Sequence, residues 1–392
     1  MGKRFGWLLA AAGLFLAPSF ASAQMEVPPA IFTGPLSHPR YESGGLYWAF
    51  DFIYLKTNRP LKGQIVGERG ILDLDGSIAG QAGGFVGSRE IALHTEQVRG
   101  PGLNQPGWDM MVGWRFESGV VVELHWRHLV QARYTAQASI IPPSFNVGNQ
   151  FENTFLFAPV VNFTTDFAGN ATNIPVGSSA AVFGIWNGAS LMQIEYVQRY
   201  DIYGINARIP IVETDRWRNY GLFGPRVVWL WDRFKWRTVD LDEQGNGGPE
   251  TTAIYSNTVS NRLYGIHAGF GNDWFLGHTP MGGFAFSLDL EGGLYLDQAK
   301  TFAHWDREDR AVGTHRSRRL FALSPAAEVK GTLFWYPWEA VSLQAGYDLT
   351  MYFNTYASHR PIDFNVGTVD PEYNRQFLRW YHGLRFGISF VF

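Results

Sequence analysis

The sequence predicts an all-β chain that folds into a closed antiparallel transmembrane β-barrel of about ten strands, with twelve as the other even number that fits. Three observations lead to this fold class. Apolar and polar residues alternate over long segments, the connections between these segments are alternately long and short, and aromatic residues cluster at the ends of the expected strands.

Alternation is clearest at the end of the sequence, where Leu384, Phe386, Ile388, Phe390 and Phe392 share one face of an extended segment. The same pattern covers the expected strands at 283–297 and 339–354, and an expected hairpin with strands at 109–117 and 120–127. Weaker alternation predicts the remaining strands at 45–57, 191–210, 217–238, 261–274 and 319–335.

The expected connections provide an independent test of the barrel. Bacterial barrels have short periplasmic turns and longer outer loops. The long connections are expected at 58–107, 138–190, 239–260, 300–318 and 355–375, and the short ones at 117–119, 211–216, 275–282 and 336–338. A secreted β-sandwich is the alternative all-β fold, but it would not be expected to sort its loops in this way.

The N-terminal segment is typical of a signal peptide for Sec-dependent export. Lys3 and Arg4 precede an apolar run at 5–17, and Ala21-Ser22-Ala23 forms a small-residue cleavage site. We therefore expect a signal peptide at 1–23, a mature chain that begins at Gln24, a periplasmic segment at 24–44 and the barrel at 45–392. An uncleaved anchor helix is the alternative, but the apolar run is shorter than the roughly 20 residues that span a membrane.

Composition narrows the function classes. The 392 residues include no cysteine, which excludes disulfides and cysteine metal sites. The net charge is −3, so nucleic acid is not an expected partner. No cofactor and no metal are expected either, since two acidic turns, at 73–76 and 240–245, lack the remaining ligands of a calcium loop.

Aromatic residues at strand ends predict two girdles at the membrane surfaces, where an apolar ring with a polar group is favoured. The residues are Tyr47, Trp48, Trp335, Tyr336, Trp338, Trp380 and Tyr381. The terminal stripe of Phe386, Ile388, Phe390 and Phe392 is expected to be the signal that barrel-assembly machinery recognises. That machinery and outer-membrane lipid are the expected partners, and the outer membrane of a Gram-negative-type envelope is the expected location.

The segment from Asn261 to Gly269, with the spacing Asn-x-x-Tyr-Gly-x-x-x-Gly, resembles a planctomycete outer-membrane family of beta-barrel porins, the seventh such class. Tyr203-Gly204-Ile205-Asn206 is similar to the Tyr-Gly-x-Asn strand of that family. Gly224-Pro225-Arg226 stands where the family has Gly-Phe-Arg, so Pro225 departs from the pattern. The resemblance implies the fold and the location, and brings no established activity.

Charged side chains on the polar face of the strands are the candidate lumen-lining residues. They are Asp109, Arg115, Glu123, His125, Arg127, Asp289, Glu291, Glu328, Lys330, Asp348 and Arg385, with Asp51 and Arg379 on the same face. Unpaired charge is costly in a low-dielectric interior, so opposite charges should pair and fill a barrel of this size. The sequence thus favours a structural or surface-exposed protein with at most a narrow channel, and a small-solute porin is the alternative.

A rim-loop hydrolase is a further alternative, although an enzyme is not expected. Its candidate is the stretch His304-Trp305-Asp306-Arg307-Glu308-Asp309 in the expected loop at 300–318, with His315 downstream, where an aspartate and a histidine could polarise a water. Arginines in or next to the outer loops could instead hold anionic lipid headgroups. These arginines are Arg310, Arg316, Arg318 and Arg319.

Overall fold

The computed structural model describes residues 45–73, 76, 80–99, 104–116, 118–139, 155–163, 184–214, 216–241, 245–338 and 341–391. The expected signal peptide, the segment at 24–44 and Phe392 lie outside these residues, as do parts of both acidic turns. Ten long strands dominate the described chain. They are β1 (Gly45–Thr57), β6 (Gln105–Arg115), β7 (Val121–Ser139), β9 (Leu191–Glu213), β10 (Trp217–Val239), β11 (Thr252–Thr279), β12 (Gly282–Arg307), β13 (Gly313–Trp338), β14 (Val341–Arg360) and β15 (Glu372–Val391).

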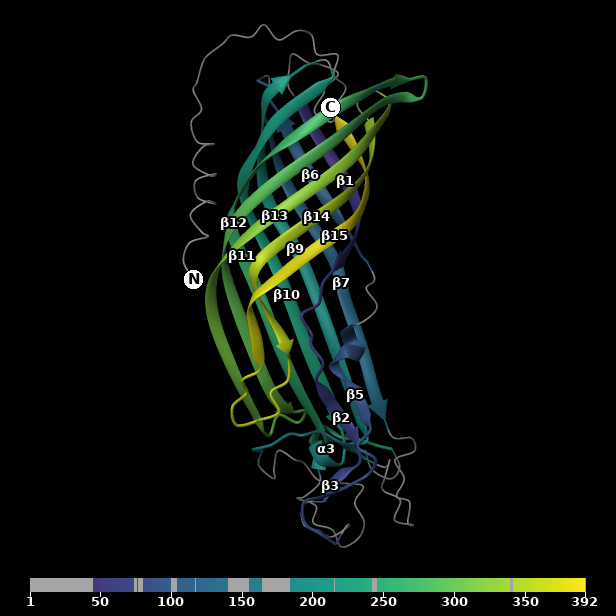
Figure 1. Cartoon of the computed structure of the whole chain (residues 1–392), viewed down its shortest axis with the longest axis vertical. Helices are drawn as coiled ribbons and strands as arrows, with labels where there is room; N and C mark the ends of the chain where they lie inside the picture. The colour runs from purple at the N-terminus through teal and green to yellow at the C-terminus, as the bar shows by residue number, and fades with distance from the viewer. Residues whose placement is uncertain are drawn as a thin grey trace, which may run out of the picture. The chain divides into compact units, whose positions relative to one another are not determined.

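The ten strands form a ring of antiparallel hydrogen-bonded neighbours. Each strand pairs with the next long strand along the chain, and β1 also pairs with β15, where Phe52 lies opposite Phe386. On its other side β1 pairs with β6, so the ring returns to its first strand. Figure 1 shows β15, in yellow, beside β1, in purple. The sequence prediction that the chain is all-β is confirmed, and the hydrogen bonding of the large sheet is ring-like.

Short turns join the strands at the end of the ring where β1 begins and β15 ends. The turn between β6 and β7 uses Gly119 with φ of +78°, a left-handed conformation that glycine adopts without strain. At this end the predicted strand boundaries agree with the structure to within a few residues.

At the opposite end two predicted connections are wrong. Most of the expected loop at 300–318 belongs to β12 and β13, which leaves 308–312 as the turn, and the expected loop at 239–260 ends where β11 begins at Thr252. The physical reason is that the outward face of these strands becomes polar here. Lys300 and His304 face outward beside inward Thr301 and Trp305, so the contrast between the two faces is lost.

The outward face carries an apolar belt next to the short turns. Each long strand contributes at least one large apolar side chain that is more than a third exposed: Phe52, Trp114, Leu124, Ile205, Phe223, Ile266, Leu296, Leu323, Leu343 and Leu384. On β12 the belt runs from Phe284 to Leu296, and the next outward residues are Gln298 and Lys300. About 9 to 11 tilted strand residues cross a bilayer, so the belt is long enough to do so.

Aromatic residues border the belt, with three corrections to the predicted girdles. One is Tyr336, whose hydroxyl is buried and whose ring stacks on that of inward Phe334. Trp48 stacks on Phe390 at 5.7 Å between ring centroids, close to the short turns. Tyr47 and Tyr381, which were expected in the girdles, point inward and are only 8% and 3% exposed. Each shares a dipeptide with an outward tryptophan, and neighbouring residues of a strand face opposite sides.

Shorter elements lie in the long connections. A three-stranded sheet joins β2 (Ile65–Arg69), β5 (Ile91–His94) and β8 (Leu156–Phe157), and β3 (Ile71–Asp73) pairs with β4 (Gly84–Val86). The helical turns are η1 (Thr95–Arg99), α3 (Gly184–Asn187) and η2 (Pro249–Thr251). No helix among the described residues is long and apolar enough to cross a membrane.

Candidate functional site: the filled interior and an outer groove

Arg127 is the centre of an ion-pair network inside the ring. From β7 its Nε donates to Asp109 on the neighbouring β6 at 2.8 Å. Its other two nitrogens reach Glu328 on β13 at 3.2 Å and Asp348 on β14 at 2.8 Å. Because β13 and β14 are not hydrogen-bonded neighbours of β7, these contacts cross the interior of the ring.

Glu328 connects Arg127 to a second pair of cations. It accepts from Arg226 of β10 at 2.7 Å and lies 3.2 Å from the ammonium of Lys330. Arg226 and Lys330 both contact Glu291 as well, at 2.9 and 3.1 Å. Each carboxylate thus has at least two cations beside it, which is the condition under which buried ions are tolerated.

The network continues toward the short turns through two further clusters. Arg385 pairs with Asp51 at 3.3 Å and with Asp348 at 3.4 Å. Glu123 accepts from Arg208 at 3.1 Å, from Asn206 at 2.8 Å and from the hydroxyl of Tyr47.

The structure buries ten of the eleven candidate lumen-lining residues inside the ring, and the exception is Arg115. The most exposed side chain among the ten is that of Lys330, at 12%. Asp289 accepts a hydrogen bond from Tyr220 at 2.6 Å, and His125 lies 2.6 Å from Asp109. Arg115 lies at the end of β6 and lines a small cavity beside the turns.

Sequence analysis missed Arg208, Arg226 and His267, and with them most of the contacts of Glu123 and Glu291. All three lie on strands with weaker alternation. On β10, apolar residues such as Val228 and Leu230 occupy the same inward face as Arg226, so the strand has no purely polar side. The signal that could have identified Arg226 is its spacing of two and four residues from Val228 and Leu230, which places all three on the same face of the strand.

Tyrosines fill the interior on the side of the ion pairs that is nearer to the long connections. Tyr200 stacks on Tyr381 with 3.9 Å between centroids, and its hydroxyl lies 3.1 Å from that of Tyr352. Apolar side chains from five strands pack around them: Ile53, Leu55, Leu129, Ile202, Val228, Leu230 and Leu263.

The end of the ring that bears the long connections is filled by a tryptophan cluster. Trp186 of α3 packs against Trp236 of β10 at 5.4 Å and against Trp305 of β12 at 4.9 Å. Parts of the long connections at 61–98, 155–160 and 362–369 complete this core. Trp305 was expected in an exposed loop, so its burial is a further correction.

The interior cavities that the described residues line are small by comparison with these packed layers. One beside Asp289 and Arg385 has a volume of about 50 Å³, room for a few waters. Another beside Glu291 and Tyr352 has about 10 Å³.

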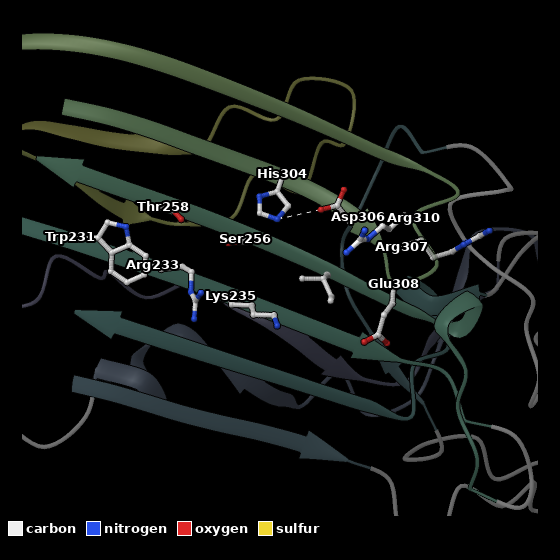
Figure 2. Close-up of a pocket in the computed structure, with 11 residues that line it drawn as sticks. Trp231, Arg233, Lys235, Ser256, Thr258, His304, Asp306, Arg307, Glu308 and Arg310 are labelled. Atoms are coloured by element: carbon white, nitrogen blue, oxygen red, sulfur yellow. Dashed lines mark ion pairs between the residues drawn. The ribbon is translucent and has the colours of Figure 1, made fainter. Parts of the chain in front are cut away.

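A groove of about 700 Å³ lies on the outward face, beyond the apolar belt. It is lined by Trp231, Arg233 and Lys235 of β10, by Ile254, Ser256 and Thr258 of β11, by His304, Asp306 and Arg307 of β12, and by Glu308 and Arg310. Figure 2 shows these side chains along the strands.

His304 and Asp306 of the candidate hydrolase stretch line this groove, whereas His315 does not. His304 Nε2 is 3.3 Å from Asp306, and Ser256 is the partner of His304 on the neighbouring strand (Figure 2). The other ring nitrogen of His304 has no hydrogen-bond partner in the described structure, so the hydroxyl of Ser256 is not held as a nucleophile. Burial lowers the pKa of His304, which favours the neutral ring at pH 7.

Other parts of the expected loop site are dispersed. His315 lies opposite His304 on β13, and within the described chain no group of three or more potential ligands could hold a metal ion. Arg316 and Arg318 lie on β13 and pair with Asp370 at 3.3 and 2.8 Å.

No family model and no curated protein matches the chain. Similar solved structures include the outer membrane protease OmpT of Escherichia coli, with 7% identity and a TM-score of 0.39, which covers 89% of this chain and 97% of that one. A Pseudomonas aeruginosa FadL homologue has 9% identity, a TM-score of 0.26 and 90% coverage of both chains. At these scores nothing about activity follows, and the resemblance to the planctomycete family stays a prediction.

Proposed function

We propose that this chain is an integral outer-membrane β-barrel protein with a closed ten-stranded wall and a filled interior, which serves a structural or surface role and conducts at most through a narrow path. The observation that carries the proposal is the contact of Arg127 with carboxylates on β6, β13 and β14. A guanidinium that bridges the ring occupies the space that a wide column of water would need.

The apolar belt supports the membrane position. Outward leucines and aromatics on all ten strands would be exposed to water in a soluble protein, and contiguous apolar patches of that extent are rare there. In a barrel, the same side chains face lipid while the interior stays polar. We assign the short turns to the periplasm and the long connections to the outside.

A hydrolase is the weaker alternative. The pair of His304 and Asp306 has no engaged nucleophile, and it lies on the outward wall of a groove that is lined largely by charged side chains.

Single cysteines test the position and the orientation, because the chain has no cysteine of its own. With Arg310→Cys, at the turn between β12 and β13, we expect labelling of intact cells by a membrane-impermeant maleimide. With Ser118→Cys, at the opposite end of the ring, labelling should require a permeabilised outer membrane.

Leu288→Cys, in the middle of the belt, is the matched third position and should react poorly with the charged reagent in both states. Equal labelling of all three cysteines in intact cells, or recovery of the protein in the soluble fraction, would contradict the proposal.

A further inference from the structure

The outward groove has the chemistry of a binding site. A row of paired residues crosses its floor, from Lys235 on β10 through Ser256 on β11 to His304 on β12. Hydroxyl, imidazole and ammonium groups therefore lie side by side on one face of the sheet (Figure 2). Trp231 closes the groove on the side nearest the belt.

The charge of the groove is unbalanced in favour of cations. Four basic and two acidic side chains line it. One of the acids, Glu308, already pairs with Arg237 at 3.4 Å. Among the described residues neither Lys235 nor Arg310 has a carboxylate within ion-pair distance, and both are left to bind an external anion.

Trp231 adds an apolar platform beside these cations. Arg199 lies 4.8 Å above its ring, and Arg233 lies 5.6 Å from it. Arg233 is held in this place by Glu195 at 2.8 Å. An indole with guanidinium groups at its face suits a ligand that has an apolar ring surface and a negative group.

The position of the groove limits the source of such a ligand. Trp229, 45% exposed, ends the belt on β10, and Trp231 is the next outward residue. On β12, Leu296 is the last apolar residue of the belt. Because the strands of such barrels are tilted, His304 lies about 20 Å farther out than Leu296 along the membrane normal. The groove therefore begins at Trp231, beside the hydrocarbon, and extends outward past the roughly 5 to 8 Å headgroup layer of a phospholipid, into the layer that the sugars of an outer-leaflet glycolipid occupy.

We propose that this groove binds the phosphate-bearing sugar headgroup of an outer-leaflet glycolipid. Lys235 and Arg310 neutralise the phosphate, the hydroxyls of Ser256 and Thr258 bond to the sugar, and Trp231 packs against the sugar ring. The membrane position under "Proposed function" underlies the choice of a lipid as the source.

Calorimetric titration of the refolded protein in neutral detergent tests the groove itself. The probes are glucosamine 1-phosphate, glucosamine and inorganic phosphate. We expect glucosamine 1-phosphate to bind at least about tenfold more tightly than glucosamine or inorganic phosphate. It alone can contact both the cations and the sugar-binding groups of the groove. Lys235→Gln should weaken this binding about tenfold, through the loss of one charge-assisted contact.

Lys300→Gln is the matched control, because Lys300 is an exposed outward lysine on β12 that does not line the groove. The affinity of the Lys300→Gln variant for glucosamine 1-phosphate should stay within about twofold of that of the wild type. No binding of glucosamine 1-phosphate, equal affinity for inorganic phosphate, or equal losses in the two lysine variants would overturn the site.

Reconstitution distinguishes a lipid from a soluble sugar phosphate. Wild-type protein in nanodiscs of phosphatidylcholine with lipopolysaccharide should retain the glycolipid through purification, and Lys235→Gln should retain less. Binding in detergent without such retention would assign the groove to a soluble sugar phosphate and overturn the glycolipid. The detergent titration needs no bilayer, so a failure of membrane insertion and a failure of the groove give different results.

Discussion

Arg127→Ala is expected to lower the free energy of unfolding by about 3 to 5 kcal/mol. The substitution removes the cation that Asp109, Glu328 and Asp348 share in the interior, and it leaves their charges without that partner. The measurement is a guanidinium titration of the refolded protein in detergent, followed by tryptophan fluorescence and by heat-dependent mobility on a gel.

Arg133→Ala is the matched control on the same strand. The side chain of Arg133 is 60% exposed and pairs with Glu195 at 3.3 Å, so its loss should cost about 1 kcal/mol or less. In the double variant Arg127→Met with Asp109→Asn, one charge of each sign is removed, and we expect part of the stability to return. Equal effects of the Arg127 and Arg133 variants would show that the interior network does not hold the fold together.

Leu288→Arg is expected to destabilise the membrane-embedded protein by about 2 to 4 kcal/mol, because it places a charge near the middle of the belt. The residue faces outward on β12 between Asn272 and Gly331 of the neighbouring strands. Unfolding in lipid vesicles measures the effect. The loss should shrink in detergent, where the charge reaches water more readily.

Ser317→Arg introduces the same charge just beyond the edge of the belt that is nearer to the long connections, and so tests where the belt ends. Ser317 is exposed and outward on β13, among the polar residues beyond the belt, so its replacement should change stability by less than about 0.5 kcal/mol. If both arginines were tolerated equally well in vesicles, the assignment of the belt to the hydrocarbon would be wrong.

The fold could be predicted from the sequence where one face of a strand is apolar and the other polar. Leu384 and Phe386 face outward while Arg385 between them is buried, as the alternation indicates. The prediction of strand ends fails beyond the belt, since both faces of β12 near His304 mix polar and aromatic residues. Periodicity detects only a difference in polarity between the two faces of a strand, and beyond the belt that difference is lost.

The interior could be predicted in part. The acidic residues were found because they alternate with apolar neighbours, as Asp289 and Glu291 do with Leu290. Their partners and the tryptophan cluster depend on which strands meet across the ring, and no local pattern reports that. The groove depends on the register that sets Lys235 beside Ser256 and Ser256 beside His304, which likewise appears only when the strands are paired.

A planar-bilayer recording of the refolded wild-type protein tests the central claim, the filled interior, most directly. We expect small conductance or none, because ion pairs, stacked tyrosines and the tryptophan cluster occupy successive layers of the ring. A large, stable, ion-selective conductance would contradict the claim, most clearly if Glu123→Lys reversed the selectivity while stability stayed unchanged.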